Sequence, residues 1–420
     1  VLDDENSGTA LNANGATLSL NTGSGGIVAT QTTNDVAELR SDGASIALDT
    51  SFEANGDVGS GSPDPDNRVQ FYNDQAKVSI QTDGGDVWIG GLEDATGVTY
   101  DAIDTFTGGA ATNAGLVNIA SRNSTAPWTS SRINGDVDTG GTGDGGAQTY
   151  GDPIIITQAV TFTSAGTSAD GNIQFDQDVT DNGGGFDLSI DAGSANSGTV
   201  TFGDGADDGT GDTLGDLVDI DGTLSLTADG GITANAAPNQ DLTLRSVDLV
   251  LSIGTDFVTA AGTLSLYTAD GSTPINLGVT TPGDEGGYEL TDSEIAILNA
   301  GTIGTLVIGE DTVQSGRVLF RTTDLSGSGA DIAVYSNSGS GKIYLDDEDT
   351  DSALDIGAGD ITMAAGTGGI QAENFSYAGP TAQAELQSSG VITLTSAAAI
   401  GADQPSDPDP GPENGPLQIL

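Results

Sequence analysis

The chain has 420 residues, with 62 acidic against 9 basic side chains and a formal net charge of −53. It contains no Cys and no His, which excludes disulfides, thiolate nucleophiles, imidazole metal sites and a Ser-His-Asp triad. Nucleic acid is an unsuitable partner, because a polyanion requires neutralising cations that this composition lacks. Low hydrophobicity with high net charge is typical of disorder, so the residue pattern must decide whether the chain folds.

Apolar residues alternate with polar ones in short runs along the whole chain, which is typical of half-buried β-strands. In chain order the clearest runs are 18–20, 46–48, 78–80, 87–89, 173–175, 188–190, 200–202, 224–226, 242–244, 264–266, 343–345 and 392–394. Gly, Asp, Asn and Ser separate these runs and are typical of tight turns. No window shows sustained apolar spacing of a helix, so the sequence predicts an all-β fold.

One strand recurs at a regular distance along the chain. Residues 222–230 (GTLSLTADG) return as residues 262–271 (GTLSLYTADG), and residues 241–245 (DLTLR) lie halfway between them. The underlying unit is therefore about 20 residues long, and such a unit buries its apolar face only by stacking on its neighbours. The sequence predicts a parallel β-helix solenoid of about twenty coils; the alternative is an antiparallel β-sandwich array.

Three stretches resemble the filamentous-haemagglutinin-like large exoproteins and β-strand-repeat adhesins of bacteria. The first comprises residues 133–137, 145–150 and 154–158, the second residues 171–179, 198–202 and 214–226, and the third residues 288–302 and 306–309. The resemblance implies a right-handed parallel β-helix that is exported for adhesion or matrix building. Such exoproteins are often far longer than this chain, which implies a processed piece or a relative that gains length by assembling subunits.

The sequence divides into four predicted regions. We expect N-terminal β-helix coils with long loops in residues 1–130 and the main repeat region in residues 131–400. Residues 401–416 are rich in Pro and Asp, which is typical of an extended linker. Residues 417–420 form an apolar tip that we expect to dock on another surface.

The ends of a β-helix expose unpaired backbone groups, which invite another strand to pair with them. Contact between the last coil of one copy and the first coil of the next joins different surfaces and gives an open-ended fibre. We expect the C-terminal segment to add to a neighbouring copy by β-augmentation. Its residues are Pro416, Leu417, Gln418, Ile419 and Leu420.

The start of the chain has no basic segment and no apolar stretch, which predicts a mature chain whose signal peptide has been removed. The expected location is extracellular or at the cell surface. No run of 18 apolar residues occurs, so membrane insertion is not predicted.

Several acidic clusters are candidate Ca²⁺ sites, since Ca²⁺ takes six to eight oxygen ligands. The main candidates are Asp204, Asp207, Asp208 and Asp212, and Asp346, Asp347, Asp349 and Asp351. Weaker candidates lie at residues 64–67 and at residues 136–144, beside a glycine-rich segment that partly resembles a Ca²⁺-binding repeat. The alternative is a set of solvated acidic loops. No cofactor other than Ca²⁺ is predicted.

The sequence therefore predicts a secreted, non-enzymatic structural protein whose partners are copies of itself. One alternative is a monomeric surface adhesin that binds polysaccharide or a host surface. A second alternative is a polysaccharide lyase or hydrolase on a β-helix. Paired carboxylates are too abundant here to indicate catalysis, and seven scattered Arg residues do not form a basic groove for an acidic polymer. No catalytic residue is predicted.

Overall fold

The computed structural model describes eleven segments in detail, together with short strands between residues 9 and 121. The segments are residues 131–151, 153–194, 197–203, 216–221, 223–228, 232–234, 241–252, 258–280, 286–346, 352–373 and 385–401. The chain forms two compact units. The first comprises Val1–Asp221, Ser225–Asn235 and Ser252–Thr255, and the second comprises Gly222–Leu224, Ala236–Leu251 and Asp256–Leu420.

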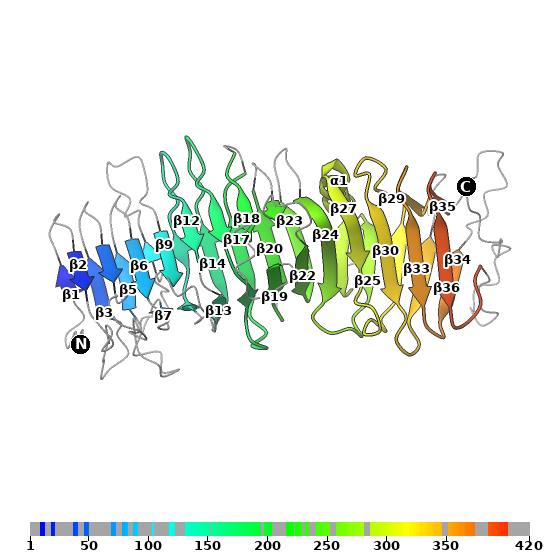
Figure 1. The fold of residues 1–420 in the computed structure, drawn as a ribbon, viewed down its shortest axis with the longest axis horizontal. Coiled ribbons are helices and arrows are strands. Elements are labelled where there is room, and N and C mark those ends of the chain that lie inside the picture. Colours follow the sequence, from blue (N-terminus) through cyan, green and yellow to red (C-terminus); the bar gives the residue numbers. More distant parts are fainter. Residues whose placement is uncertain are drawn as a thin grey trace. The chain divides into compact units, whose positions relative to one another are not determined.

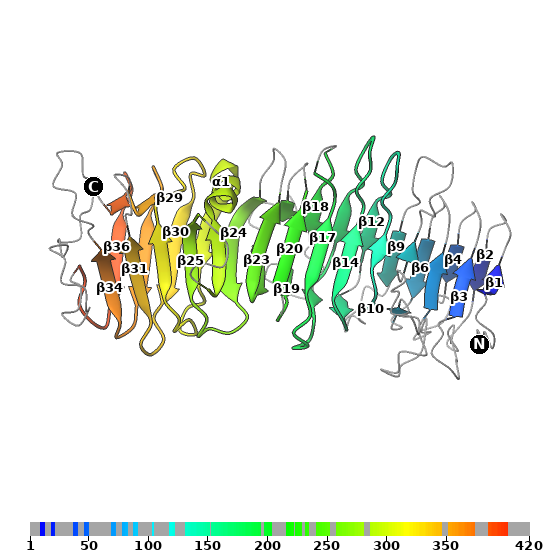
Figure 2. The same cartoon turned by 180° about the vertical axis from the view of Figure 1, so that it is seen from behind.

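The first unit is a stack of parallel strands arranged in three ladders (Figures 1 and 2). One ladder contains β1 (Thr9–Asn12), β3 (Ala37–Arg40), β5 (Val69–Tyr72), β7 (Val87–Gly90), β10 (Ser131–Asn134), β13 (Ile154–Ile156), β16 (Val179–Thr180) and β19 (Asp216–Asp219). The second contains β2 (Leu18–Asn21), β4 (Ile46–Asp49), β6 (Val78–Thr82), β9 (Val117–Ser121), β12 (Gln148–Tyr150), β15 (Ile173–Phe175), β18 (Val200–Phe202) and β21 (Ile232–Ala234). The third contains β8 (Ile103–Asp104), β11 (Val137–Asp138), β14 (Val160–Thr163) and β17 (Leu188–Asp191).

The second unit has the same organisation. Its first ladder contains β22 (Leu242–Ser246), β24 (Val258–Thr268), β27 (Ile303–Ile308), β30 (Asp331–Ser336), β33 (Ile361–Ala365) and β36 (Ile392–Ser396). The second contains β26 (Tyr288–Thr291), β25 (Ile275–Val279), β28 (Val318–Arg321), β31 (Lys342–Asp346) and β34 (Gly369–Glu373). The third contains β29 (Thr323–Asp324), β32 (Leu354–Asp355) and β35 (Leu386–Gln387). The chain also forms β20 (Thr223–Thr227), β23 (Asp248–Ser252) and the helix α1 (Asp292–Ala300).

Every strand pairing described in detail is parallel, and apart from β25 with β26 the paired strands come from successive coils. This confirms the predicted parallel β-helix and excludes an antiparallel sandwich array for the described residues. The coils are longer than the predicted unit of about 20 residues. Leu242 pairs with Leu264, which lies 22 residues later, whereas Ile361 pairs with Ile392, which lies 31 residues later. A coil needs three strands and three corners, and the sequence repeat marked only one of those strands.

Alternating burial along the strands places one row of side chains inside the coils. In the first unit this row includes an aromatic stack: Tyr150, Phe175 and Phe202 occupy equivalent positions of three successive coils. Their ring centroids are 5.0 Å and 5.8 Å apart, and Phe162 packs edge-on against Tyr150 and Phe175 at 5.1 Å and 5.3 Å. Such stacking of like residues on like is the direct result of in-register parallel pairing.

Buried hydroxyl groups close the corners beside this stack. The Thr139 hydroxyl donates to the Gly146 carbonyl at 2.6 Å, and one coil later the Ser164 hydroxyl donates to the Gly171 carbonyl at 2.7 Å. Gly145 allows the coils to approach, because a Cβ there would lie 1.9 Å from the Ser164 carbonyl oxygen. The glycine-rich segment that resembles a Ca²⁺-binding repeat is thus a close backbone contact between coils.

The helix α1 was not expected from the sequence. Its start is a capping box: the Glu294 backbone N–H donates to the Thr291 hydroxyl, and the Thr291 N–H donates to the Glu294 carboxylate at 2.7 Å. In the sequence, the three-residue spacing of Thr291 and Glu294 indicates a helix start, but we interpreted residues 288–302 as strand repeats. Within the described part of the chain, no helix has the length and apolar character needed to cross a membrane.

Candidate functional site

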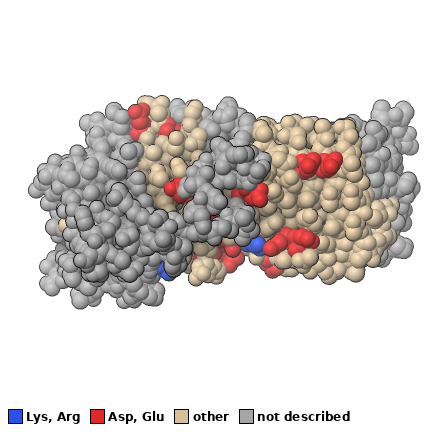
Figure 3. All heavy atoms as spheres, in the orientation of Figure 1, with Lys and Arg blue, Asp and Glu red and all other residues tan. Residues whose placement is uncertain are grey.

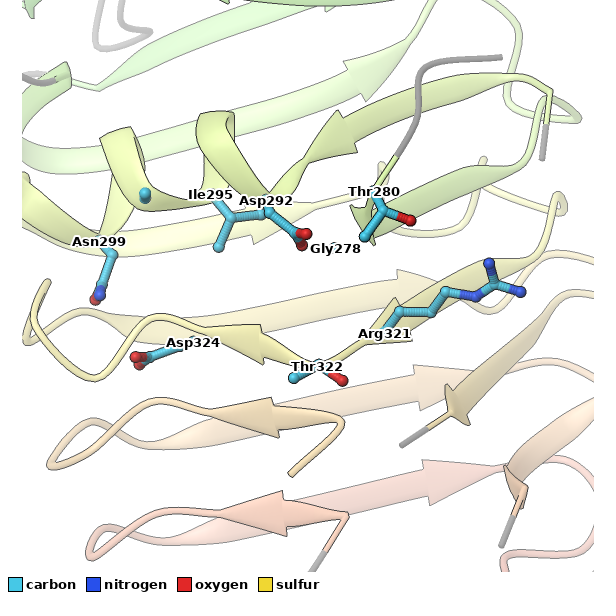
Figure 4. A pocket seen from close by; sticks show the side chains of 9 residues that line it. Gly278, Thr280, Asp292, Ile295, Asn299, Arg321, Thr322 and Asp324 are labelled. Carbon is cyan, nitrogen blue, oxygen red and sulfur yellow. The ribbon is translucent and has the colours of Figure 1, made fainter. Parts of the chain in front are cut away.

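A surface hollow of about 300 Å³ lies in the second unit, between α1 and the strand ends of β25, β28 and β29 (Figure 4). We call it the α1 hollow. Its lining residues are Gly278, Thr280, Asp292, Ile295, Ala296, Asn299, Arg321, Thr322 and Asp324. Leu264 and Leu306 pair as neighbouring rungs of the first ladder. The chain between them is longer than a regular coil and contains β25, β26 and α1, whose insertion creates the hollow.

One wall of the α1 hollow is a stripe along the helix. Asp292, Ile295, Ala296 and Asn299 have the spacing i, i+3, i+4 and i+7, which places them on one face of a helix. Asp292 and Ala296 are exposed, whereas Ile295 is buried. The Gly327 N–H donates to Asn299 Oδ1 at 2.6 Å, so the Asn299 side-chain oxygen is already bonded to a loop.

The facing wall is a sharp bend between β28 and β29. Thr322 has φ 39°, an unusual conformation for a β-branched residue. Beside it, Arg321 is held by Asp346, with 3.3 Å between Nε and Oδ2. In Figure 4 the Arg321 side chain extends away from Asp324. Asp324 Oδ1 accepts hydrogen bonds from the N–H and the hydroxyl of Ser326, at 2.9 Å and 2.6 Å.

Carboxylates outside the hollow connect successive coils. In five places, an Asp accepts a backbone N–H from the next coil, at distances of 2.6 to 3.0 Å, and in four of them that N–H lies at or beside the start of a strand. The pairs are Asp136 with Thr161, Asp178 with Leu217, Asp241 with Thr263, Asp331 with Asp360, and Asp360 with Val391. These carboxylates therefore satisfy backbone donors at the corners, a role that needs no cation.

The predicted Ca²⁺ sites fall mostly outside the described residues. This applies to Asp204, Asp207, Asp208, Asp212, Asp347, Asp349 and Asp351. Asp346 is described, and its buried carboxylate lies against Arg321. Among the residues the structure describes, no group of three or more acidic side chains is placed to hold a metal ion. Calcium binding stays a prediction.

A second group of acids surrounds the buried Tyr288. Asp248 Oδ1 accepts the N–H groups of Leu249 and Glu289 at 3.1 Å and 3.0 Å, and Glu294 Oε1 accepts the Leu251 N–H at 2.9 Å. Burial raises the pKa of Asp248, its backbone hydrogen bonds lower it, and the charges of Glu294 and Glu289 raise it further. The ionised form of Asp248 is therefore disfavoured in the folded state.

We expect Asp248→Asn to stabilise the fold at pH 7, by up to about 1 kcal/mol because the group is partly exposed. The amide oxygen keeps both backbone hydrogen bonds, since both end on Oδ1. Because the pKa of Asp248 is higher in the folded state, its ionisation lowers the stability of the fold progressively as pH rises from about 4 through the folded pKa. Urea unfolding between pH 3 and pH 8 should show a smaller loss of stability with rising pH in the variant.

Asp270 is the matched control for Asp248, because the fold lowers the pKa of Asp270 and raises that of Asp248. Hydrogen bonds from the Ser272 N–H and hydroxyl lower the pKa of Asp270. Asp270 therefore stabilises the fold above its unfolded pKa, and this contribution disappears as pH falls through its folded pKa. Asp270→Asn should lower stability at pH 7. If Asp248→Asn and Asp270→Asn change the stability of the fold in the same direction at pH 7, the environments assigned to the two carboxylates are wrong.

The last described coil has an exposed apolar end. Ile361 and Met363 of β33 are fully buried, but Ile392 and Leu394, at the equivalent positions of β36, are only half-buried. Val391 is 64% exposed. At the equivalent position of the two preceding coils, Asp331 and Asp360 each accept a backbone N–H from the next coil. Val391 occupies this position in the last described coil, so the series of acids ends there.

Charge is missing from both terminal coils. No charged residue occurs between Leu386 and Ala402, a run that contains β36, and none occurs between Asn6 and Asn34, a run that contains β1 and β2. Figure 3 shows acidic side chains elsewhere on the described surface, with few basic ones. A charge-free coil presents no like charge to another copy in a chain of net charge −53, although residues 105–121 and 153–169 are also free of charge. Our interpretation of the sequence missed this signal, although the printed sequence shows it.

Comparison of the chain with protein-family models, with curated proteins and with solved structures finds no match in any of the three. The resemblance to haemagglutinin-like exoproteins therefore stays a prediction.

Proposed function

We propose that the chain is a structural subunit that joins copies end to end, with the last coil of one copy against the first coil of the next. The observation that carries this proposal is the charge-free, half-exposed apolar end of β36. A parallel ladder continues whenever a further strand pairs with its edge, so a second copy extends it without any new fold.

The backbone of β36 supports this role. The Ile361 N–H donates to the Val391 carbonyl, and the Ala397 N–H donates to the Ala365 carbonyl, so odd-numbered residues of β36 face β33. Hydrogen-bonding directions alternate along a strand, which directs the N–H and C=O groups of Ile392 and Leu394 away from β33. In the described first ladder of the second unit, β36 pairs with β33 alone.

The contact joins two different surfaces, so it generates an open-ended series of copies. This agrees with the extracellular fibre predicted from the sequence, and a secreted fibre subunit is the function that we propose. Repulsion between highly acidic copies opposes the contact, and salt screens it. The predicted docking segment, residues 416–420, lies outside the described residues, and the proposal does not depend on it.

The test is Leu394→Lys, which places a charge on the stacking surface. We expect association to weaken at least tenfold, because about 1.4 kcal/mol corresponds to a factor of ten and an unpaired buried charge costs more. Thr395→Lys is the control, since Thr395 is exposed and points outward from the same strand. Sedimentation velocity at rising protein and salt concentrations measures association, and electron microscopy shows the products.

Three outcomes would contradict end-to-end joining. One is a wild-type chain that stays monomeric at all concentrations. Another is equal loss of association in the two Lys variants. The third is association that appears only after residues 402–420 are removed, which would mean that these residues cover β36 within one copy. Circular dichroism of both variants establishes that they fold.

A further inference from the structure

We propose that the α1 hollow binds a sugar residue of a neutral polysaccharide. This inference is independent of end-to-end joining, because the hollow lies in the second unit at α1, away from β36 in the chain. A volume of about 300 Å³ is at the lower end of the range for small-molecule sites, which suits a single sugar residue of a longer chain.

The polar groups of the hollow match the hydroxyl groups of a sugar. The carboxylate of Asp292 is an acceptor, and the hydroxyls of Thr280 and Thr322 both donate and accept. The Asn299 amide is oriented by its bond from the Gly327 N–H, which leaves its Nδ2 as a donor. Sugar hydroxyls, which donate and accept, need such a mixture.

The apolar part of the hollow matches the other face of a pyranose ring. Ala296 is exposed, and the mostly buried Ile295 lines the hollow beside it, so the two supply a small aliphatic surface between the polar groups of α1. The C–H groups on one face of a sugar ring pack against such a surface while the hydroxyls point to the rim. Thr280, Asp292 and Asp324 are exposed, so the hollow is open and the rest of a polymer can continue into solvent.

Charge selects a neutral sugar over an acidic one. Asp292 and Asp324 border the hollow, and the one cation among its described lining residues, Arg321, already faces Asp346. A uronic acid or a sulfated sugar would meet two carboxylates without a matching cation, in a chain of net charge −53. The structure therefore assigns a neutral hexose polymer as the ligand class.

The backbone of the facing wall is fixed before any ligand binds. Thr322 is held at φ 39°, and Gly278, at φ +77°, packs against the backbone of Arg321. A rigid wall lowers the entropic cost of binding, although no aromatic ring is among the described lining residues. We expect a dissociation constant of about 1 mM for one site. Several copies joined end to end would bind a long polysaccharide more tightly through multivalency.

The experiment is saturation-transfer-difference NMR on the full chain with cellotetraose, laminaritetraose and maltotetraose as neutral probes. Trigalacturonate is the anionic probe, and fully deacetylated chitotetraose is the cationic probe. We expect saturation transfer to at least one neutral oligosaccharide and none to trigalacturonate. Asp292→Ala should weaken neutral binding about tenfold, because it removes a charged hydrogen-bond acceptor.

A second pair of variants separates filling of the hollow from damage to the helix. Ala296→Leu adds a side chain inside the hollow, whereas Ala300→Leu adds the same side chain on the same helix outside the lining. We expect Ala296→Leu to weaken binding and Ala300→Leu to leave it unchanged. Absence of neutral binding, tighter binding of either charged probe, or equal effects of the two Leu variants would each overturn the proposal.

Discussion

Replacement of Phe175 with Ala is expected to destabilise the first unit by about 4 kcal/mol. The ring is fully buried and lies at the centre of the aromatic stack, with Tyr150 at 5.0 Å, Phe202 at 5.8 Å and Phe162 edge-on at 5.3 Å. Removal of a buried Phe side chain costs about 3–5 kcal/mol through lost burial and the remaining cavity. The measured range for such substitutions already includes lost ring contacts, of which Phe175 makes three.

Urea unfolding monitored by circular dichroism measures this loss, and hydrogen exchange locates it. In a solenoid the coils interact mainly with their neighbours, so protection should fall most in β12, β15 and β18. Phe175→Leu should lose less stability than Phe175→Ala, because it keeps part of the buried volume. Thr201→Ala is the control: Thr201 lies outward on β18, opposite Gln174, and its loss should cost less than about 1 kcal/mol. Similar losses for Phe175→Ala and Thr201→Ala would mean that the stack is not the core.

The strands of this stack could be predicted from the sequence because alternation directly reports one buried and one exposed face. Residues 173–175 and 200–202 were predicted as strands, and they are β15 and β18. Stacking also followed from the repeat, since residues 242–244 and 264–266 are neighbouring rungs in register. The coil length did not follow, because corners and loops vary in length and carry no periodic apolar signal.

The helix α1 was missed for a physical reason. It has nine residues, and its buried side chains include the acid Glu294. An apolar stripe is therefore weak in such a short segment, and the capping pair of Thr291 and Glu294 is the clearer signal. The preceding strand, Tyr288–Thr291, does belong to a ladder, so the interpretation as a strand is right there and wrong for Asp292–Ala300.

The α1 hollow could not be predicted from the sequence, because its walls come from separate parts of the chain. Thr280, Asp292 and Thr322 meet only through the register of β25 with β26 and with β28. A single sequence does not give that register. The acids present the same difficulty: Asp331 and Asp360 resemble solvated or cation-binding residues until the pairing of coils places a backbone N–H beside each carboxylate.

Gly278→Ala is expected to destabilise the second unit by about 3 kcal/mol or more. Gly278 has φ +77° and lies at a register shift between β25 and β26, where the strand bulges. A Cβ at this position would lie 1.7 Å from the Arg321 carbonyl oxygen, and that oxygen belongs to a backbone that cannot rotate away. The substitution therefore combines left-handed strain, about 1–2 kcal/mol, with overpacking, about 1–3 kcal/mol.

Gly329→Ala separates these two contributions. Gly329 has φ +68°, close to the value at Gly278, but a Cβ there would meet nothing within 4 Å. Its replacement should cost only the strain, about 1–2 kcal/mol. Urea unfolding of both variants, monitored by circular dichroism, gives the difference, which we assign to the close approach of Gly278 and the Arg321 backbone. Equal losses would show that β25 and β28 do not pack as closely as the register of Leu277 with Phe320 requires.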